Sequence, residues 1–136
     1  MPAALRTRTV RKEIYKKYLV KSEEFLRAAN DSFRRGDYDA CTSAAVHSAI
    51  NAVDALTSFY LQMRHAGESH GDVMMLVRRV QLSPREIDRL TNHYSAMLKT
   101  KNIAEYEDRL LNGKEAEAVL KHLYRLRSMI LSALPG

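Results

Sequence analysis

Residues 38–63 read YDACTSAAVHSAINAVDALTSFYLQM, and this run sets the architecture of the chain. Alanine dominates it. Alanine has the highest helix propensity of any residue, and its small side chain lets neighbouring backbones approach closely. Apolar groups coat most of the helix that these residues would form, which is typical of a helix buried inside a domain. We therefore predict a central helix over residues 38–63.

The segments before and after this run are amphipathic. Residues 10–35 place apolar side chains three, four or seven positions apart, so that they share one helical face. Residues 72–80 form a short predicted helix. The last helix is predicted over residues 114–134, after a turn at Asn112 and Gly113.

The start of the remaining helix is marked by residues 83–86, Ser-Pro-Arg-Glu. This is a capping box with proline at the first helical position. The helix either ends near residue 101 or continues to residue 106. No alternating β-branched run and no hairpin signal occurs. The predicted fold class is all-α, an up-down bundle of four long helices and one short helix.

The chain has 136 residues, which suits one domain. Its net charge of +6 is uneven, because residues 1–21 hold seven basic side chains and one acidic one. We predict a basic flexible arm over residues 1–11 and a single helical domain over residues 12–136. The arm either contacts phosphates or is a solvated terminus.

Composition excludes several classes of protein. No apolar run approaches the length of a membrane span, and the N-terminus has no apolar signal region. The single cysteine, Cys41, cannot form an internal disulfide and is expected to be a small buried apolar residue. A cytoplasmic location is the simplest prediction. No glycine-rich phosphate loop is present, and no cofactor is expected.

A polar stripe runs down the central helix. Its members fall within about 80° of one another at 100° per residue. They are Ser43, His47, Asn51, Asp54 and Ser58. Polar groups on a buried helix are normally hydrogen-bonded or solvated. The stripe is therefore either a ligand site or a satisfied network with Lys101, Asn102 or the last helix.

Two motifs resemble a known family. Residues 44–56, AAVHSAINAVDAL, follow a helix start at residues 37–40, DYDA. This pattern resembles the alanine-rich second helix of HEPN domains. Residues 101–106, KNIAEY, resemble the family's late segment, often Arg-x-x-Ala-Asp/Glu-Tyr. The order and spacing of the helices agree with the family over about residues 12–134.

The resemblance implies a helical bundle that pairs as a homodimer. Many HEPN domains are metal-independent ribonucleases, frequently the toxin of a toxin–antitoxin pair, whereas others are inactive and bind nucleotides or protein partners. The active forms carry an arginine, then four to six residues, then a histidine. The guanidinium holds the scissile phosphate, and the imidazole moves the proton of the 2′-hydroxyl.

This sequence departs from the active pattern. Lys101 stands where the family has arginine, Asn102 keeps the polar residue that follows it, and Tyr106 occupies the histidine position. Lysine holds a phosphate only as a point charge. Tyrosine, with a reference pKa near 10, is a poor general base at neutral pH. The ribonuclease motif is therefore interpreted as degraded.

One literal match to the active spacing joins Arg64 to His70, with five residues between them. It falls in a predicted loop over residues 65–71, and the composition gives about 1.5 such matches by chance. His65, His70 and Asp72 fit no standard metal-ligand spacing, so no metal site is predicted.

These observations lead to one hypothesis and two rivals. The first is a dimeric HEPN-like module that binds RNA, a nucleotide or a partner protein without being an active enzyme. An antitoxin or a nucleotidyltransferase would be such a partner. The predicted ligand-binding residues are His47, Asn51, Asp54, Lys101 and Asn102.

The second hypothesis is an active ribonuclease, such as a toxin, that uses Lys101 or an unrecognised arginine with His47, His70 or His93. The third is a purely structural helical adaptor. A histidine within hydrogen-bond reach of an arginine or lysine in a shared cleft would favour the ribonuclease over the others.

Overall fold

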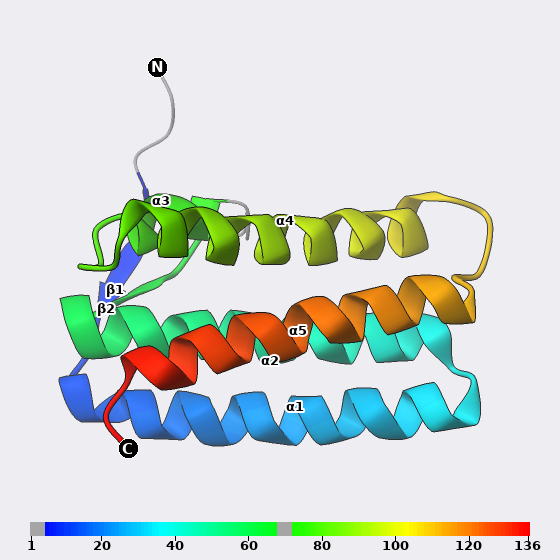
Figure 1. The fold of residues 1–136 in the computed structure, drawn as a ribbon, viewed down its shortest axis with the longest axis horizontal. Coiled ribbons are helices and arrows are strands. Elements are labelled where there is room, and N and C mark those ends of the chain that lie inside the picture. The colour runs from blue at the N-terminus through cyan, green and yellow to red at the C-terminus, as the bar shows by residue number, and fades with distance from the viewer. Residues whose placement is uncertain (1–4, 68–71) are drawn as a thin grey trace.

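The computed structural model describes residues 5–67 and 72–136. The described elements follow one another along the chain as β1 (Thr7–Thr9), a 3₁₀ turn η1 (Lys12–Ile14), α1 (Tyr15–Arg35), α2 (Tyr38–Leu61), β2 (Met63–His65), α3 (Val73–Val77), α4 (Pro84–Tyr106) and α5 (Gly113–Ala133). The four long helices run roughly along the long axis of the molecule (Figure 1). The prediction of an all-α bundle with one additional short helix is confirmed.

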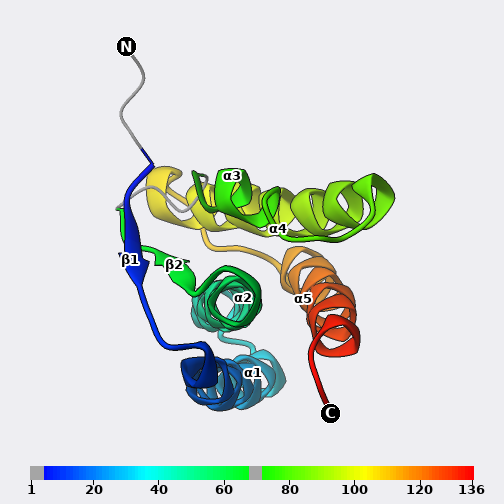
Figure 2. The same ribbon diagram turned by 90° about the vertical axis from the view of Figure 1, so that its left-hand side faces the viewer.

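Helix α2 is the centre of the fold. Seen end-on, it is surrounded by α1, α4, α5 and the two short strands (Figure 2). More than half of its residues are buried, including Cys41, Val53 and Leu56. The alanines on α2 leave room for this close packing from several sides, since their side chains add little volume. The prediction of a buried central helix is therefore confirmed.

The ends of the helices follow local sequence signals. Gly36 has a φ of 78°, a left-handed conformation that closes α1 at low cost because glycine has no Cβ. Ser83 and Glu86 form the predicted capping box of α4, and this helix continues to Tyr106. Asn112 caps α5 by accepting a hydrogen bond from the Glu115 amide, so Gly113 is the first helical residue rather than part of a turn.

The absence of strands was predicted, and this prediction is wrong for two short segments. Thr7–Thr9 and Met63–His65 pair as an antiparallel ribbon, with Arg8 opposite Arg64. Helix α2 consequently ends at Leu61, because Gln62 takes a left-handed φ of 53° and turns the chain into β2. His65, predicted to be in a loop, lies in β2. Each strand has only three residues and shows no apolar alternation, so no period-2 signal exists to be read.

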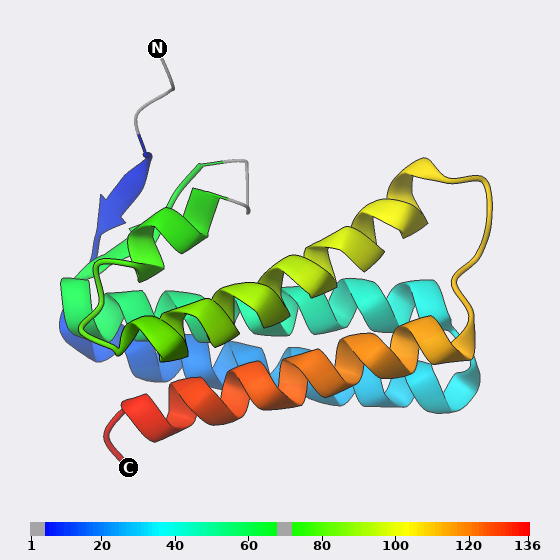
Figure 3. The ribbon, with the colours of Figure 1, turned by 45° about the horizontal axis from the view of Figure 1, so that its top comes forward.

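The ribbon fixes the start of the chain to the end of α2. The Val10 amide donates to the Gln62 carbonyl at 3.0 Å, and the Lys12 ammonium lies 4.2 Å from the centre of the Phe59 ring. Part of the segment predicted as a flexible arm is therefore a paired strand. The ribbon lies at one end of the bundle, and the loop between α4 and α5 lies at the other (Figure 3).

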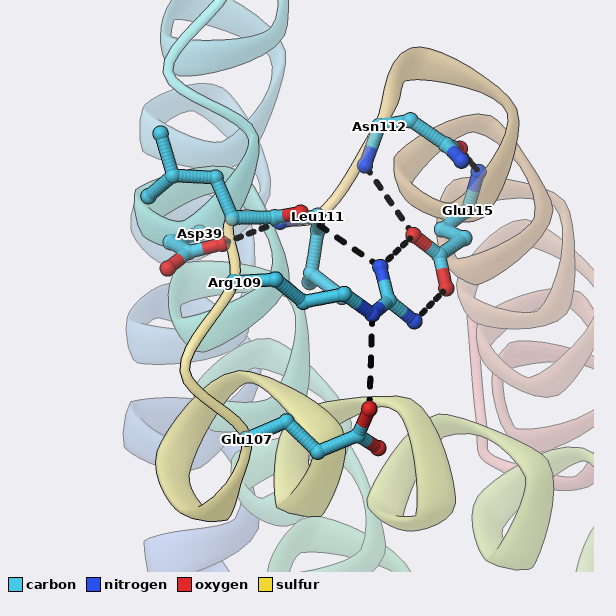
Figure 4. A network of polar contacts seen from close by, with 7 residues as sticks. Asp39, Glu107, Arg109, Leu111, Asn112 and Glu115 are labelled. Atoms are coloured by element: carbon cyan, nitrogen blue, oxygen red, sulfur yellow. Dashed lines mark hydrogen bonds and ion pairs between the residues drawn. The ribbon is translucent and has the colours of Figure 1, made fainter.

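That loop is held by a network of polar contacts (Figure 4). The Arg109 guanidinium donates two hydrogen bonds of 2.9 Å to the Glu115 carboxylate, and its Nε lies 3.4 Å from Glu107. The Leu111 amide donates to Asp39 at the start of α2. The contact with Arg109 lowers the pKa of Glu115 to about 2. The network thereby ties the end of α4 to the first turns of α2 and α5.

Candidate functional site

The predicted polar stripe on α2 divides into an exposed half and a buried half. The His47 ring is exposed and stacks on Phe25, with ring centres 5.2 Å apart. The Asn51 side chain donates to the His47 carbonyl at 2.8 Å, a contact within the same helix. Asp54 and Ser58 are buried. Among the stripe residues, Asp54 is the one that enters an internal cavity.

This cavity, of about 140 Å³, is lined by residues of α2, of β2 and the segment after it, of α3 and of α4. Its polar side chains come from α2, from β2, which follows α2 directly, and from α4, which is distant in sequence. Its lining consists of Ile50, Asp54, Arg64, His65, Ala66, Gly67, Val73 and Tyr94. We refer to it as the Asp54 cavity.

Burial controls the ionisation of Asp54. Loss of hydration raises the pKa of its carboxyl group to about 7, although the positive charges of Arg64 and Lys21 oppose this shift. Near neutral pH the carboxyl group is therefore divided between its protonated and ionised forms. A carboxyl group in this condition both donates and accepts hydrogen bonds and is a frequent component of functional sites.

Arg64 brings a cation to the cavity from β2. One terminal nitrogen of its guanidinium donates to the His65 carbonyl at 3.2 Å. Its Nε is buried and has no partner among the described residues. Its charge also lowers the pKa of Tyr18 on α1, although burial makes the net shift of that pKa upward. Arg64 therefore has unused donor capacity beside an acid of variable charge.

Arg8 lies directly opposite Arg64 in the ribbon. Residues that are directly opposite in an antiparallel pair project to the same face, so these two cations are neighbours. Like charges in this position destabilise the pairing of the strands. An anion bound between the two guanidinium groups would remove that repulsion.

Tyr94 closes the cavity from α4. Its side chain is buried, and its hydroxyl has no hydrogen-bond partner among the described residues. Burial, together with the negative charge of Asp54, raises the pKa of Tyr94 well above its usual value. The hydroxyl is therefore a neutral donor that faces the cavity. The sequence identified Tyr94 as a core residue, which is confirmed, but nothing in the sequence linked it to Asp54.

The wall beyond β2 is tightly packed at Gly67. A Cβ added to Gly67 would lie 3.1 Å from Nε2 of His65, a contact too short for an unadjusted side chain. His65 is itself buried, and loss of hydration lowers the pKa of its imidazole, which favours the neutral form. The wall is therefore close-packed and uncharged, and the charges of the cavity come from Asp54 and Arg64.

The residues of the degraded motif do not line the Asp54 cavity. Lys101 pairs with Glu105 one turn ahead at 2.6 Å, and Asn102 is exposed. Tyr106 is 81% exposed at the end of α4. Tyr106 comes twelve positions after Tyr94, which corresponds to about 18 Å of helix. In the described parts of the chain, no hydrogen bond or ion pair joins Lys101 or Asn102 to the α2 stripe.

The Arg64–His70 match is described only at its first member. Arg64 lines the Asp54 cavity, whereas His70 lies outside the described residues. Over residues 5–67 and 72–136, no group of three or more histidine, cysteine, aspartate or glutamate side chains is arranged to hold a metal ion. No described helix is long and apolar enough to cross a membrane.

The sequence matches the HEPN domain family over residues 15–133. This match covers most of the chain. The chain belongs to the HEPN domain family. The bundle of four long helices, with the buried α2 at its centre, is therefore a HEPN fold. Strand β1 lies before the matched region in the sequence, whereas its partner β2 lies within it.

A solved structure supports the fold of this HEPN domain. The crystal structure of TT1696 from Thermus thermophilus superimposes with a TM-score of 0.70 at 17% sequence identity. The similarity covers 89% of this chain and 98% of TT1696. At this identity the likeness concerns the fold alone. A comparison with curated protein sequences gives no significant match.

Proposed function

We propose that this HEPN domain is a homodimeric RNA-binding module without the family's usual ribonuclease chemistry, and that it holds RNA phosphates at the β1–β2 ribbon. One observation carries the proposal: Arg8 lies directly opposite Arg64 in the ribbon, and Arg64 lines the Asp54 cavity. The arrangement is unfavourable without an anion and favourable with one.

The surroundings of the two arginines support phosphate binding. Lys21 is close enough to Asp54 to influence its pKa, so a third cation lies nearby. Asp54 lies beside these cations, and its raised pKa leaves it partly neutral at pH 7. The ribbon is also continuous with the basic residues 1–21, which hold the whole net charge of the chain. Phosphate contacts dominate sequence-independent binding to nucleic acids.

The residues at the motif positions support a module without catalysis. Active HEPN sites need a guanidinium and an imidazole together, whereas this chain has Lys101 paired with Glu105 and an exposed Tyr106. Neither side chain is an imidazole, the group that moves the proton in the active pattern.

The first experiment measures binding of a labelled single-stranded RNA by fluorescence anisotropy at several salt concentrations. Arg64→Gln should weaken binding by about tenfold, the value of one charge-assisted hydrogen bond. It should also reduce the slope of log affinity against log salt by about 1. The matched control is Arg34→Gln, an exposed arginine of α1 that pairs with Asp31. Equal losses for the two variants would contradict the proposal.

The second experiment tests the absence of cleavage. We expect no cleavage of mixed single-stranded RNA by the wild-type chain in EDTA. The double variant Lys101→Arg with Tyr106→His should gain cleavage, because it restores a phosphate fork and a near-neutral base together. Cleavage by the wild type that disappears in His47→Ala or His93→Ala would overturn the proposal.

The dimer is tested by sedimentation. It should give twice the chain mass of 15.5 kDa, and a monomer would contradict the dimer.

A further inference from the structure

Two histidines form a direct contact between α4 and α5, away from the Asp54 cavity. Nδ1 of His93 and Nδ1 of His122 are 3.0 Å apart, and both rings are partly buried. At this distance one ring carries the hydrogen on Nδ1 and the other accepts it. The contact therefore contains one proton shared between two neutral imidazoles.

The pair lies among cations. Arg89 of α4 and Arg125 of α5 are both exposed, and both charges act on His93. Arg125 acts on His122 as well. Within the described part of the chain, neither guanidinium takes part in an ion pair, in contrast to Arg109. Two cations with unused donors thus flank two titratable rings.

His93 and the two arginines share one groove, and His122 contacts it through His93. His93, Arg89 and Arg125 line an open cavity of about 680 Å³, together with Asn92, Tyr124 and Ser128. The described residues that line it include no carboxylate. Tyr124 is anchored by a hydrogen bond of 2.9 Å from its hydroxyl to Asn30 on α1, so its ring has a defined position at the edge of the groove. The groove offers hydrogen-bond donors, a hydroxyl, an amide and an aromatic face.

The charges explain how this groove would respond to an anion. Burial, the two arginines and the neighbouring ring together lower the pKa of His93, and burial with Arg125 lowers that of His122. An anion in the groove would offset the cationic field and favour protonation. The pair accepts one proton without losing its hydrogen bond, because a doubly protonated ring donates to its neutral neighbour. A second proton would break the contact.

We propose that the groove between α4 and α5 is a phosphate-binding site in which His93 and His122 take up one proton when the dianion binds between Arg89 and Arg125. The arginines supply the fixed charge, the imidazole pair supplies the adjustable charge, and Ser128 and Asn92 supply neutral hydrogen bonds. Tyr124 offers a stacking face to an organic group attached to the phosphate. The phosphate is either free or carried as a monoester.

The test is isothermal titration calorimetry of the full chain with inorganic phosphate, ribose 5-phosphate, adenosine 5′-monophosphate and adenosine. The phosphate-bearing compounds should bind and adenosine should not. Tighter binding of adenosine 5′-monophosphate than of the other two would identify a monoester with an aromatic group, and equal binding would identify free phosphate. Adenosine binding as tightly as its monophosphate would overturn the proposal, as would the absence of binding by all three phosphates.

Variants localise the site. Arg125→Gln should weaken binding by about tenfold, whereas Arg34→Gln, at the C-terminal end of α1 and outside the lining of the groove, should leave it unchanged. Arg64→Gln should also leave it unchanged, so that failure here is distinguishable from failure of RNA binding at the ribbon. Equal affinity in Arg125→Gln and the wild type would overturn the proposal.

Proton uptake is tested separately. Between pH 8 and pH 6 the affinity should rise more steeply for the wild type than for His122→Gln, by up to about tenfold per pH unit. The comparison isolates the imidazoles, since the phosphate itself titrates with a pKa of about 6 in both proteins. In the wild-type chain, nuclear magnetic resonance of the imidazole nitrogens should show shifts at His93 and His122 but not at His47. Identical pH dependence, or shifts at His47 alone, would overturn the proposal.

Discussion

Helix α2 buries polar groups on two sides, and the two regions differ in how those groups are satisfied. Toward α1 and α5, the Ser22 and Ser48 hydroxyls donate to each other's backbone carbonyls at 2.8 and 2.7 Å. The Arg127 guanidinium from α5 donates to Ser22 and pairs with Glu23 at 2.5 Å. We refer to this region as the serine seam. Each of these side chains has a hydrogen-bond partner.

Toward α4 and the ribbon, the Asp54 cavity lacks that completeness. Arg64 Nε and the Tyr94 hydroxyl are buried without partners among the described residues, and Asp54 has a pKa raised to about 7. Satisfied buried networks add rigidity and specify one packing, whereas an unsatisfied group costs folding free energy. We infer from this difference that the serine seam stabilises the fold. The unsatisfied groups of the Asp54 cavity lower the free energy of unfolding, and their donors, unpaired among the described residues, are available to a ligand.

The strongest effect of a substitution should occur in the serine seam. Glu23→Ala should lower the free energy of unfolding by about 2–3 kcal/mol, because it leaves the guanidinium of Arg127 without a carboxylate partner; the 49% exposure of the Glu23 side chain keeps the loss below that of a fully buried pair. The side chain of Arg127 is only 9% exposed, so water replaces that partner poorly. Urea unfolding followed by circular dichroism measures the change. Glu24→Ala, at the neighbouring exposed position, is the control, since the ion pair of Arg127 is with Glu23. An equal loss of unfolding free energy in this variant would contradict a stabilising role for the seam.

The second effect has the opposite sign. Asp54→Asn should raise the free energy of unfolding at pH 8 by about 2 kcal/mol, because the folded state has to ionise a buried carboxyl group whose unfolded counterpart ionises readily. The folded pKa of about 7 lies above the ordinary aspartate pKa of 3.8. The wild type therefore loses stability as the pH rises through that window. The gain of the variant should vanish below about pH 4.

Unfolding curves at several pH values test this prediction. Asp88→Asn, at an exposed position on α4, provides the comparison. A gain of equal size in this variant would contradict the assignment of the effect to the buried Asp54. A destabilised Asp54→Asn at pH 8 would mean that the carboxylate is well satisfied and that the two regions are alike.

The weakest effect concerns Tyr94. Tyr94→Phe should change the free energy of unfolding by less than about 1 kcal/mol. Among the described residues the hydroxyl has no hydrogen-bond partner, so its removal leaves no other polar group unsatisfied. Thermal unfolding compares it with Tyr106→Phe, in which the altered ring is already exposed. A loss of several kcal/mol in Tyr94→Phe would show that the hydroxyl is bonded in the folded protein, and the contrast with the serine seam would disappear.

Much of the fold could be predicted from the sequence because its signals are local. The alanine-rich run predicted a buried α2, and the Ser83 capping box predicted the start of α4. The ribbon could not be predicted, since Thr7–Thr9 pairs with Met63–His65 across more than fifty residues and neither segment alternates. The predicted site residues remain predictions. Asp54 and Arg64 share a cavity, while His47, Lys101 and Asn102 lie apart from it.

Local sequence signals thus specify the helices, their caps, the buried character of α2 and the concentration of positive charge in residues 1–21. Each of these depends on residues within a few turns of one another, where propensity and periodicity act. Tertiary packing alone places Arg8 opposite Arg64, sets Tyr94 against the cavity of Asp54, and brings His93 to His122. These contacts join distant segments, and their geometry depends on how whole helices pack.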